Sequence, residues 1–378
     1  MAAPMEAGGP ARPWAEAPVF AYTERDLIRS GVRWGGPGPA SRFDAALRSA
    51  WEERMSGGCF RYRLQGPELP SRLLPGPRRF VAQLNTKRAT ERRRPQEILS
   101  LQQPFDPERF NFTRIPPREV LFSLRRGGAA GAGRREQPEP LLIINVSPLE
   151  WGHVLLLPEP ARGLPQLLTR DSVLRALELL FLSSEPGFRV GFNSLGASAS
   201  VNHLHLHGYY LGHRLELESA PTEPLAPGSP RNGAAGPRPR VHLLSGHPTR
   251  GLVFYTDGTD LPQAAAAVHA LTRLLVRRSL AHNLFLTRGC PLGSRAAEPG
   301  SRDGVRIVLW PRRSCFGVKE ETAFNVALCE LAGHFPIKNP QDYSSLTEEK
   351  ALEIICKHLL SEEEFSQLRS EIIEFLQD

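Results

Sequence analysis

Histidine stands at every second position in the stretch SASVNHLHLHGYYLG, as His203, His205 and His207. On a β-strand, side chains at positions i, i+2 and i+4 point to the same face. The three imidazoles are therefore predicted to lie together, while Leu204 and Leu206 face the core. Burying three imidazoles side by side without partners is costly, so the pattern needs a chemical explanation.

Three interpretations of the triplet are open. The histidines can be incidental residues on a polar outer face of a sheet. They can bind zinc, since neutral imidazole is the commonest metal ligand, although no Cys, Asp or Glu nearby completes a ligand set. They can also act as nucleophiles on a phosphate, because an imidazole with an ordinary pKa of about 6.5 is mostly neutral at pH 7.

A similar order of predicted elements occurs twice along the chain. The first copy reads strand, strand, helix, strand, strand over residues 140–148, 153–159, 170–183, 187–194 and 200–211. The second copy reads strand, helix, strand, strand over residues 251–256, 261–280, 282–289 and 305–313. Recurrence after roughly 100 residues indicates a duplicated unit. Because the last strand of the second copy, VRIVLWPRR, has no histidine, we expect that copy to be degenerate.

The predicted fold class is α+β: a duplicated unit with antiparallel sheets, flanking helices and additional C-terminal helices. Its expected divisions are a flexible N-terminus (1–17), a first half with the active site (18–218), a flexible linker (219–240), a degenerate second half (241–340) and C-terminal helices (341–378). Residues 125–139 are a further segment expected to be flexible. Such stretches bury too little apolar surface to offset the entropy of ordering them.

Two helix starts are predicted near the C-terminus. Ser345 and Glu348, and then Ser361 and Glu364, have the spacing of a capping box. After the second box, apolar residues at helical spacing form a stripe that is predicted to pack on the core. The stripe consists of Phe365, Leu368, Ile372 and Phe375.

Composition narrows the class of protein. The chain of 378 residues has a formal net charge of +7, and its arginines are densest at residues 78–94. Such a region suits a phosphorylated small substrate or a nucleic acid, although a solvated face has the same composition. The chain has no uninterrupted apolar run of membrane-spanning type and no signal-peptide core, so we expect a cytoplasmic protein. Its five cysteines form no C-x-x-C pair and are predicted to be reduced thiols.

The triplet and its surroundings resemble the histidine-triad superfamily of nucleotidyl transferases and hydrolases. SVNHLHLH is similar to the His-φ-His-φ-His signature of that superfamily, and FNSLGASASV to the turn that precedes the triad. NVSPLEWGHVLLLPE resembles its N-x-x-P-x-x-x-G-H-x-L-x-x-P strand pair. The three segments follow one another in the order of the superfamily.

Four segments extend the resemblance to the GDP-hexose phosphorylases. They are FVAQLNTKRATERRRPQEI, QQPFDPERFNFTRI, NHLHLHGYYL and FNVALCELAGH. The resemblance implies a doubled histidine-triad fold like that of galactose-1-phosphate uridylyltransferase. It also implies phosphorolysis of a GDP-hexose, which is GDP-D-glucose in the animal branch that the chain resembles most, to GDP and a hexose 1-phosphate. GDP-hexose and inorganic phosphate are then the expected partners, with no cofactor, metal, nucleic acid or membrane.

The resemblance also implies roles for individual residues. His205 is expected to attack the α-phosphorus and to carry GMP covalently between two displacements. His203 is expected to orient it through its main-chain carbonyl, which accepts a hydrogen bond from Nδ1–H. His207 is expected near the phosphoryl oxygens or the leaving group. Asn193 and Ser200 are expected to donate to phosphate and ribose, although ordinary turn chemistry explains both equally well.

Further features leave alternatives open. His153 is predicted to make a structural hydrogen bond between strands. Lys87–Arg88 and Arg92–Arg94 suit either an incoming phosphate or a solvated loop. The plant enzymes and the uridylyltransferases tend to have glutamine at the third triad position, where this chain has His207. A triad hydrolase of nucleoside polyphosphates or RNA caps is therefore the first alternative. A non-enzymatic RNA-binding module is the second, although no aromatic–basic interleaving supports it.

Overall fold

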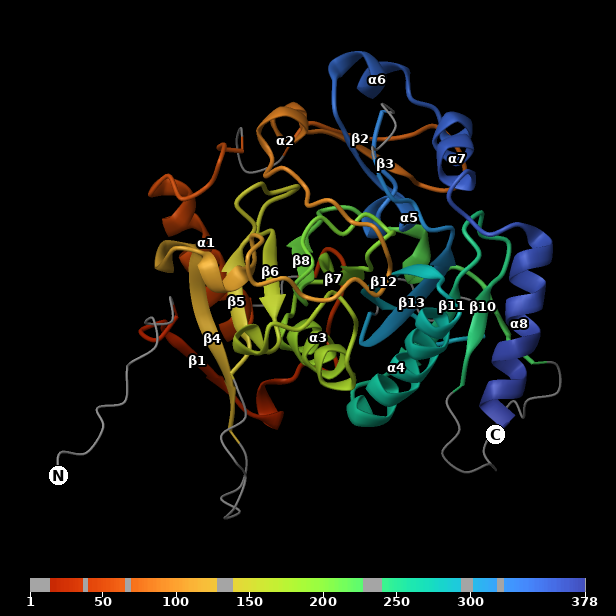
Figure 1. Ribbon diagram of the computed structural model, residues 1–378, viewed down its shortest axis with the longest axis horizontal. Coiled ribbons are helices and arrows are strands. Elements are labelled where there is room, and N and C mark those ends of the chain that lie inside the picture. Colours follow the sequence, from red (N-terminus) through yellow and green to blue (C-terminus); the bar gives the residue numbers. More distant parts are fainter. Residues whose placement is uncertain are drawn as a thin grey trace.

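In the part of the chain that the structure describes, eleven strands form one sheet that runs through the molecule (Figure 1). The computed structural model describes residues 14–36, 40–64, 69–127, 139–226, 240–293, 302–317 and 323–377. The strands of this sheet are β1 (Val19–Tyr22), β4 (Val120–Arg126), β5 (Leu141–Ile144), β6 (Val154–Leu157), β7 (Phe188–Asn193), β8 (Leu206–Tyr210), β9 (Thr222–Pro224), β10 (His242–Leu244), β11 (Leu252–Thr256), β12 (Ala281–Gly289) and β13 (Gly304–Arg312). Their order is β1-β4-β5-β6-β8-β7-β12-β13-β11-β10-β9, and β1 and β4 are the neighbours that pair in parallel.

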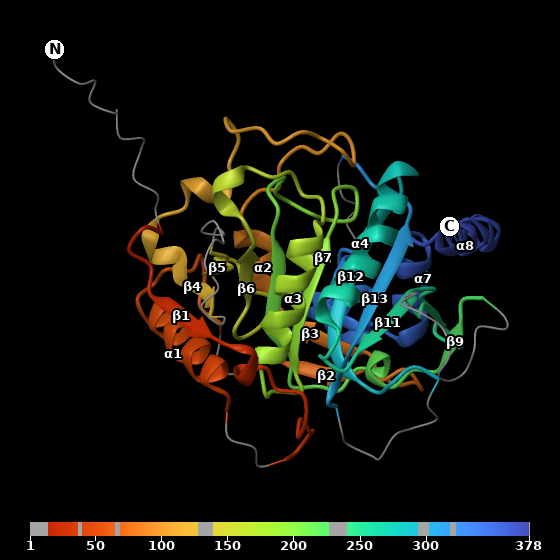
Figure 2. The same cartoon turned by 90° about the horizontal axis from the view of Figure 1, so that it is seen from below.

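The sheet contains the duplication that the sequence predicts. The run β5-β6-β8-β7 is repeated in reverse spatial order by β12-β13-β11-β10, and the two runs meet where β7 pairs antiparallel with β12. Each run has one helix between its second and third strands along the chain, α3 (Arg170–Leu182) and α4 (Leu261–Arg277). These two helices pack side by side on one face of the sheet (Figure 2). The prediction of a duplicated α+β unit is confirmed.

The central strands are buried on both faces, so alternate side chains enter two different cores. On β12, Leu284 and Leu286 join the core under α3 and α4, whereas Phe285 faces the opposite side. That opposite side is covered by a three-stranded sheet of order β14-β3-β2 and by short helices. The elements of this second layer are β2 (Ser71–Leu73), β3 (Val81–Leu84), β14 (His334–Ile337), α5 (Leu328–Leu331), α6 (Pro340–Ser345) and α7 (Glu348–Cys356).

Other helices cover the sheet near its two edges (Figure 1). In the first half, α1 (Arg42–Ser56) buries Phe43, Leu47 and Trp51 in the main core. At the C-terminus, α8 (Glu362–Gln377) buries three of the four residues of the predicted stripe, and the fourth packs beside them. The remaining helical turns are α2 (Thr86–Glu91), η1 (Glu24–Asp26), η2 (Phe112–Arg114), η3 (Pro117–Glu119), η4 (Pro160–Arg162) and η5 (Glu216–Glu218).

One of the two predicted capping boxes is present. The Glu364 N–H donates to Ser361 Oγ at 3.2 Å, and the Glu364 carboxylate accepts the Ser361 N–H at 2.6 Å, which confirms the box before α8. The box at Ser345 and Glu348 is wrong. Ser345 ends α6, and α7 is capped by Thr347, whose hydroxyl accepts a backbone N–H of the first turn at 3.3 Å. Both Ser and Thr can cap, and the hydroxyl nearer to the helix start does so.

Parts of the segments expected to be flexible are structured. β9 lies within the expected linker, residues 219–240, and pairs with β10 at the edge of the sheet, where Pro224 need not donate to a ladder. The other parts of the three segments that fall in residues 1–13, 128–138 and 227–239 lie outside the described residues. Within the described ranges, no helix is long and apolar enough to cross a membrane.

The variant Gly191→Ala tests the packing between the two halves. A Cβ built at Gly191 on β7 lies 2.6 Å from the carbonyl oxygen of Leu284 on β12, closer than real Cβ atoms come. Because a backbone oxygen in a paired strand cannot move aside cheaply, we expect the variant to lose about 1–3 kcal/mol of unfolding free energy. Chemical denaturation measures this loss. An unchanged denaturation midpoint would contradict the close approach of β7 and β12.

Candidate active site

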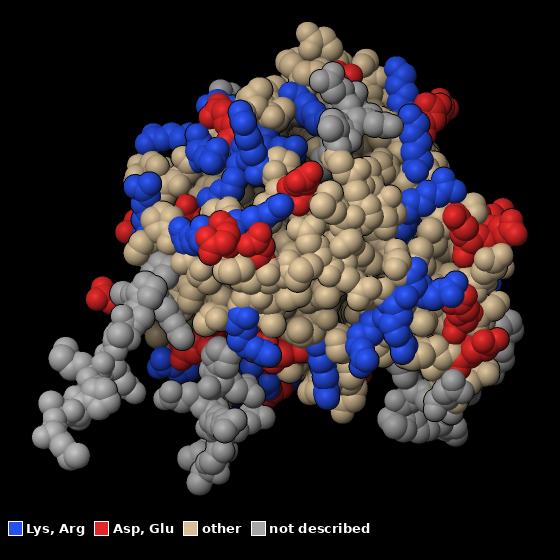
Figure 3. Space-filling model, in the orientation of Figure 1, with Lys and Arg blue, Asp and Glu red and all other residues tan. Residues whose placement is uncertain are grey.

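A cavity of about 700 Å³ lies between the large sheet and the second layer. Its lining comes from β5, β6, β7 and β8 on one side and from α2, α5 and β14 on the other. Lys and Arg side chains gather on the molecular surface around α2 (Figure 3). This volume is in the range of sites that hold a small molecule such as a nucleotide.

His205 presents a neutral imidazole to the cavity. The residue lines the cavity and is 2% exposed. Its Nδ1 lies 2.7 Å from the carbonyl oxygen of His203, which can only accept, so Nδ1 carries the proton. Nε2 therefore keeps its lone pair. Burial lowers the pKa of His205 to about 4, so the ring is uncharged at pH 7. The main-chain contact that the resemblance implies is present.

A buried glutamine, and not a strand ladder, holds this part of the triplet. β8 includes His207 but begins after His205, so the prediction of a strand over residues 200–211 is wrong for its first part. The His205 N–H donates to Gln166 Oε1 at 2.9 Å. Gln166 Nε2 donates to the carbonyls of Asn193 and His205 at 3.0 Å each. The side chain of Gln166 thus takes the place of a neighbouring strand.

The side chains of residues 204–207 alternate between the two faces of the sheet as predicted, although β8 begins only at Leu206. The rings of His205 and His207 lie 5.2 Å apart on the cavity side. Leu204 and Leu206 are buried in the main core on the other side of the sheet. The cavity and the helices α3 and α4 therefore lie on opposite faces of β8.

His203 supports its neighbour from outside the cavity lining. It is 1% exposed, and its Nδ1 accepts the Phe112 N–H at 3.0 Å. Its ring contacts those of Phe105 and Phe112, with centroids at 5.1 and 5.6 Å. Burial lowers the pKa of His203 to about 4. The His203 ring is neutral and packed among aromatic rings. The main-chain carbonyl of His203 is the group that accepts the hydrogen bond from His205 Nδ1–H.

His153 and His207 form a hydrogen-bonded pair with a defined proton arrangement. The Leu149 N–H donates to His153 Nδ1 at 2.9 Å, so the proton of His153 is on Nε2. That Nε2 lies 3.0 Å from His207 Nδ1, which accepts and leaves His207 with Nε2–H. Burial lowers the pKa of both residues well below the ordinary value. The structural hydrogen bond predicted for His153 is confirmed, and through it His207 can donate a hydrogen bond into the cavity.

Asn193 and Ser200 both line the cavity. The amide oxygen of Asn193 accepts from Asn283 Nδ2 at 2.6 Å and from the Leu328 N–H at 3.0 Å. Its amide nitrogen is therefore the group left to donate to a ligand. The Ser200 carbonyl accepts the Gln96 N–H at 2.9 Å, which holds the turn while the hydroxyl remains at the cavity wall.

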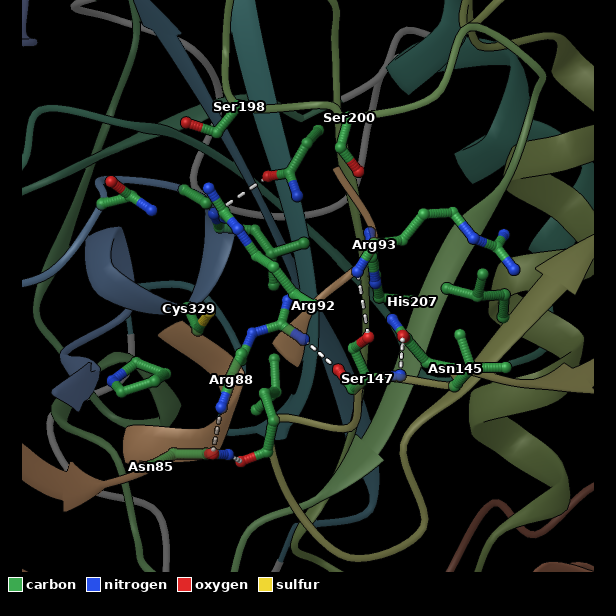
Figure 4. Close-up of a pocket in the computed structure, with 18 of the residues that line it drawn as sticks. Asn85, Arg88, Arg92, Arg93, Asn145, Ser147, Ser198, Ser200, His207 and Cys329 are labelled. Carbon is green, nitrogen blue, oxygen red and sulfur yellow. Dashed lines mark hydrogen bonds between the residues drawn. The ribbon is translucent and has the colours of Figure 1, made fainter. Parts of the chain in front are cut away.

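Among the described residues, four cationic side chains line the same cavity: Arg88, Arg92, Arg93 and Lys338. Figure 4 shows the three arginines grouped with Ser147 and His207 around the cavity. Arg88 donates to the Ser147 carbonyl. Arg92 has no hydrogen bond or ion pair within the described part of the chain, and burial, together with the charge of Arg88, lowers its pKa. An unpaired, half-buried guanidinium of this kind suits a phosphate.

Sequence reasoning missed several residues of this cavity. Lys338, Asn325, Cys329 and Glu330 come from the second half of the chain, and Glu119 from the turn before β4. Asn325, Cys329 and Glu330 lie in the segment FNVALCELAGH that extends the family resemblance, but nothing in the sequence places that segment beside the triplet, because long-range folding brings it there. Of the basic clusters named above, Arg88, Arg92 and Arg93 reach the lining. Among the residues that the structure describes, no group of three or more His, Cys, Asp or Glu is arranged to hold a metal ion.

The doubled fold, with alternating histidines at a basic cavity, has the features that the resemblance to the histidine-triad superfamily implies. Solved structures support the fold: a crystal structure of yeast Ap4A phosphorylase Apa2 superimposes with a TM-score of 0.53 and 14% identity, and covers 85% of this chain and 98% of that one.

Sequence comparisons identify the particular family. The chain matches the GDPGP1-like N-terminal domain over residues 42–209 and the GDPGP1-like C-terminal domain over residues 216–378. It is 51% identical to zebrafish (Danio rerio) GDP-D-glucose phosphorylase 1 over 95% of this chain and 98% of that protein. It is 52% identical to the human protein of that name, over 89% and 86%. Identity to Arabidopsis thaliana GDP-L-galactose phosphorylase 1 is 31%, over 94% and 79%. The chain belongs to the GDP-D-glucose phosphorylase family.

The buried His205 ring predicts an unusual titration. We expect its NMR signals to report a neutral ring, with the proton on Nδ1, from pH 8 down to pH 5.5. The reason is that burial lowers its pKa to about 4, whereas an exposed histidine titrates near 6.5. Protein labelled with ¹⁵N at histidine allows the measurement, and the variant His205→Asn assigns the signal. A midpoint near 6.5 would contradict the described environment.

Proposed function

We propose that this chain catalyses the phosphorolysis of GDP-D-glucose to GDP and glucose 1-phosphate, through GMP bound covalently to His205. Membership of the family supports the overall reaction. The observation that carries the mechanism is the hydrogen bond from His205 Nδ1–H to the His203 carbonyl, which leaves a neutral Nε2 at the cavity. A neutral imidazole needs no further base to act as a nucleophile.

In the first step, the lone pair of His205 Nε2 forms a bond to the α-phosphorus. The bond between that phosphorus and the bridging oxygen breaks, and glucose 1-phosphate leaves with the electron pair. The ring then carries a positive charge, because Nδ1 keeps its proton. The His203 carbonyl, at 2.7 Å from Nδ1, stabilises that charge.

In the second step, an oxygen of inorganic phosphate attacks the same phosphorus. The bond to Nε2 breaks, GDP leaves, and the ring returns to its neutral form. Both steps place several negative charges in one cavity, where Arg88, Arg92 and Lys338 offset them. Two displacements at one nitrogen predict ping-pong kinetics.

The surrounding groups suit the transferred phosphoryl group. His207, whose proton is on Nε2, can donate to a phosphoryl oxygen or to the leaving group. Asn193 Nδ2 and the Ser200 hydroxyl can donate to phosphate or ribose. His153 acts indirectly: it donates a hydrogen bond to His207 Nδ1 and so keeps the proton of His207 on Nε2.

We also propose the partners of the protein and the compartment in which it works. Its partners are small molecules, GDP-hexose and phosphate, and not nucleic acid. The five cysteines are free thiols, two of them buried, which supports a reducing compartment such as the cytoplasm.

Incubation of GDP-glucose with and without phosphate tests the reaction. With phosphate, we expect equal amounts of GDP and glucose 1-phosphate over many turnovers. Without phosphate, we expect at most one glucose 1-phosphate per active site, because the GMP adduct waits for its acceptor. Sustained release of GMP in the absence of phosphate would instead establish the triad hydrolase.

The variant His205→Asn tests the nucleophile. We expect turnover to fall by at least about 10³-fold, because no other group at the cavity replaces the attacking nitrogen. His282→Asn is a matched control: His282 is equally buried, and its Nδ1 also faces a carbonyl two residues before it, that of Leu280 at 3.3 Å, but it lies outside the cavity lining. Steady-state GDP release compares the two. Near-normal turnover in His205→Asn would show that another residue attacks.

A further inference from the structure

One end of the cavity has an apolar wall that extends away from the triplet. Ile143 on β5 and Leu155 on β6 line it, together with Phe112 and Val201. In the sheet, Val120 pairs with Ile143, Ile143 with Leu155, and Leu155 with His207. Residues that pair across antiparallel strands share a face, so this wall continues the face that carries His207.

The wall is long enough to accommodate a nucleoside beside the triplet. Three strand spacings separate His207 from Val120, which is about 14 Å between backbones. A phosphorus at His205 would lie at one end of the wall, and a nucleoside lying along the wall would place its base at the other end. Apolar side chains along the wall suit the flat faces of a purine.

A carboxylate and a guanidinium stand at that far end. Glu119 directly precedes Val120, lines the cavity and is 8% exposed. Arg93 also lines the cavity, with Nη2 at 3.7 Å from Glu119 Oε1 and its guanidinium 3.7 Å from the centroid of the Phe110 ring. Within the described ranges of the chain, neither carboxylate oxygen of Glu119 receives a hydrogen bond.

This pair is poorly explained as a structural ion pair. Its 3.7 Å separation exceeds the 2.7–2.9 Å of a charge-assisted hydrogen bond. Burial raises the pKa of Glu119 and lowers that of Arg93, with Arg118 and Arg61 the other charges near the carboxylate. Two charged groups that are desolvated without bonding each other retain their capacity to bind a third group.

We propose, on the basis of the function given above, that Glu119 and Arg93 select guanine as the base of the substrate. The edge of guanine presents two adjacent donors, N1–H and N2–H₂, followed by two acceptors, O6 and N7. The Glu119 carboxylate accepts from both donors, and the Arg93 guanidinium donates to O6. Adenine places an unprotonated N1 against the carboxylate and an amino group against the guanidinium, so the same pair rejects it.

Equilibrium binding of GDP, IDP and ADP tests the proposal, since the base of IDP is guanine without its 2-amino group. We expect the native protein to bind GDP about tenfold to a hundredfold more tightly than IDP or ADP. In Glu119→Gln, we expect GDP affinity to fall by a similar factor and the preference over IDP to shrink toward unity. Glu108→Gln is the matched control, because its side chain is 90% exposed and outside the cavity lining. Titration calorimetry gives all nine affinities.

Three outcomes would overturn the proposal. The first is an unchanged ratio of GDP to IDP affinity in Glu119→Gln. The second is an equal loss for all three nucleotides, which indicates a structural role. The third is equal affinity of the native protein for IDP and GDP. This comparison does not need the variant, so it tests the proposal even when Glu119→Gln does not fold. Nucleotide binding can be measured without turnover. If the protein catalysed no phosphorolysis, the proposed reaction would be contradicted, but the selection of the base could still be tested.

Discussion

The hydrogen bond from His205 Nδ1–H to the carbonyl of His203 is the interaction on which the account depends. It fixes the proton on one ring nitrogen, leaves the other with its lone pair, and provides an acceptor for the charge that the ring would carry in the proposed GMP adduct. Burial adds to this by keeping the ring neutral at pH 7. The Gln166 side chain bonds to the main chain of His205, and the Phe112 N–H donates to the ring of His203, so both partners of this hydrogen bond are held in place.

The degenerate half of the duplication still contributes to the site. On β12, Asn283 donates to the amide oxygen of Asn193, and on β13 Arg312 donates to Asn283 and to the Val326 carbonyl. Val326 also accepts from Ser198, in the turn before the triplet. The strands of the second copy, which has no histidine triplet, therefore hold the side chain of Asn193 and the turn before the triplet. The two copies thus have different parts: the first contains the histidine triplet, and the second supports it through hydrogen bonds from β12 and β13.

Local signals in the sequence predicted the features that depend on neighbours along the chain. The alternating histidines, the duplicated order of strands and helices, and the box at Ser361 are of this kind. The strand predicted over residues 200–211 was too long because its first part bonds to other groups instead of a strand: Asn202 N–H to the Gln96 side chain, Leu204 N–H to the Leu164 carbonyl and His205 N–H to the Gln166 side chain. Glu119 and Lys338 enter the cavity through contacts between distant segments, and no periodicity or spacing reveals such contacts in a single sequence.

The most direct measurement is the identity of the residue that carries GMP. Protein is mixed with GDP-glucose in the absence of phosphate, quenched without acid and digested. Tandem mass spectrometry of the peptides then locates any attached GMP. The account predicts one GMP per chain, attached to His205 and removed when phosphate is added before quenching. A GMP adduct on another residue, or turnover with no adduct at any time, would contradict it.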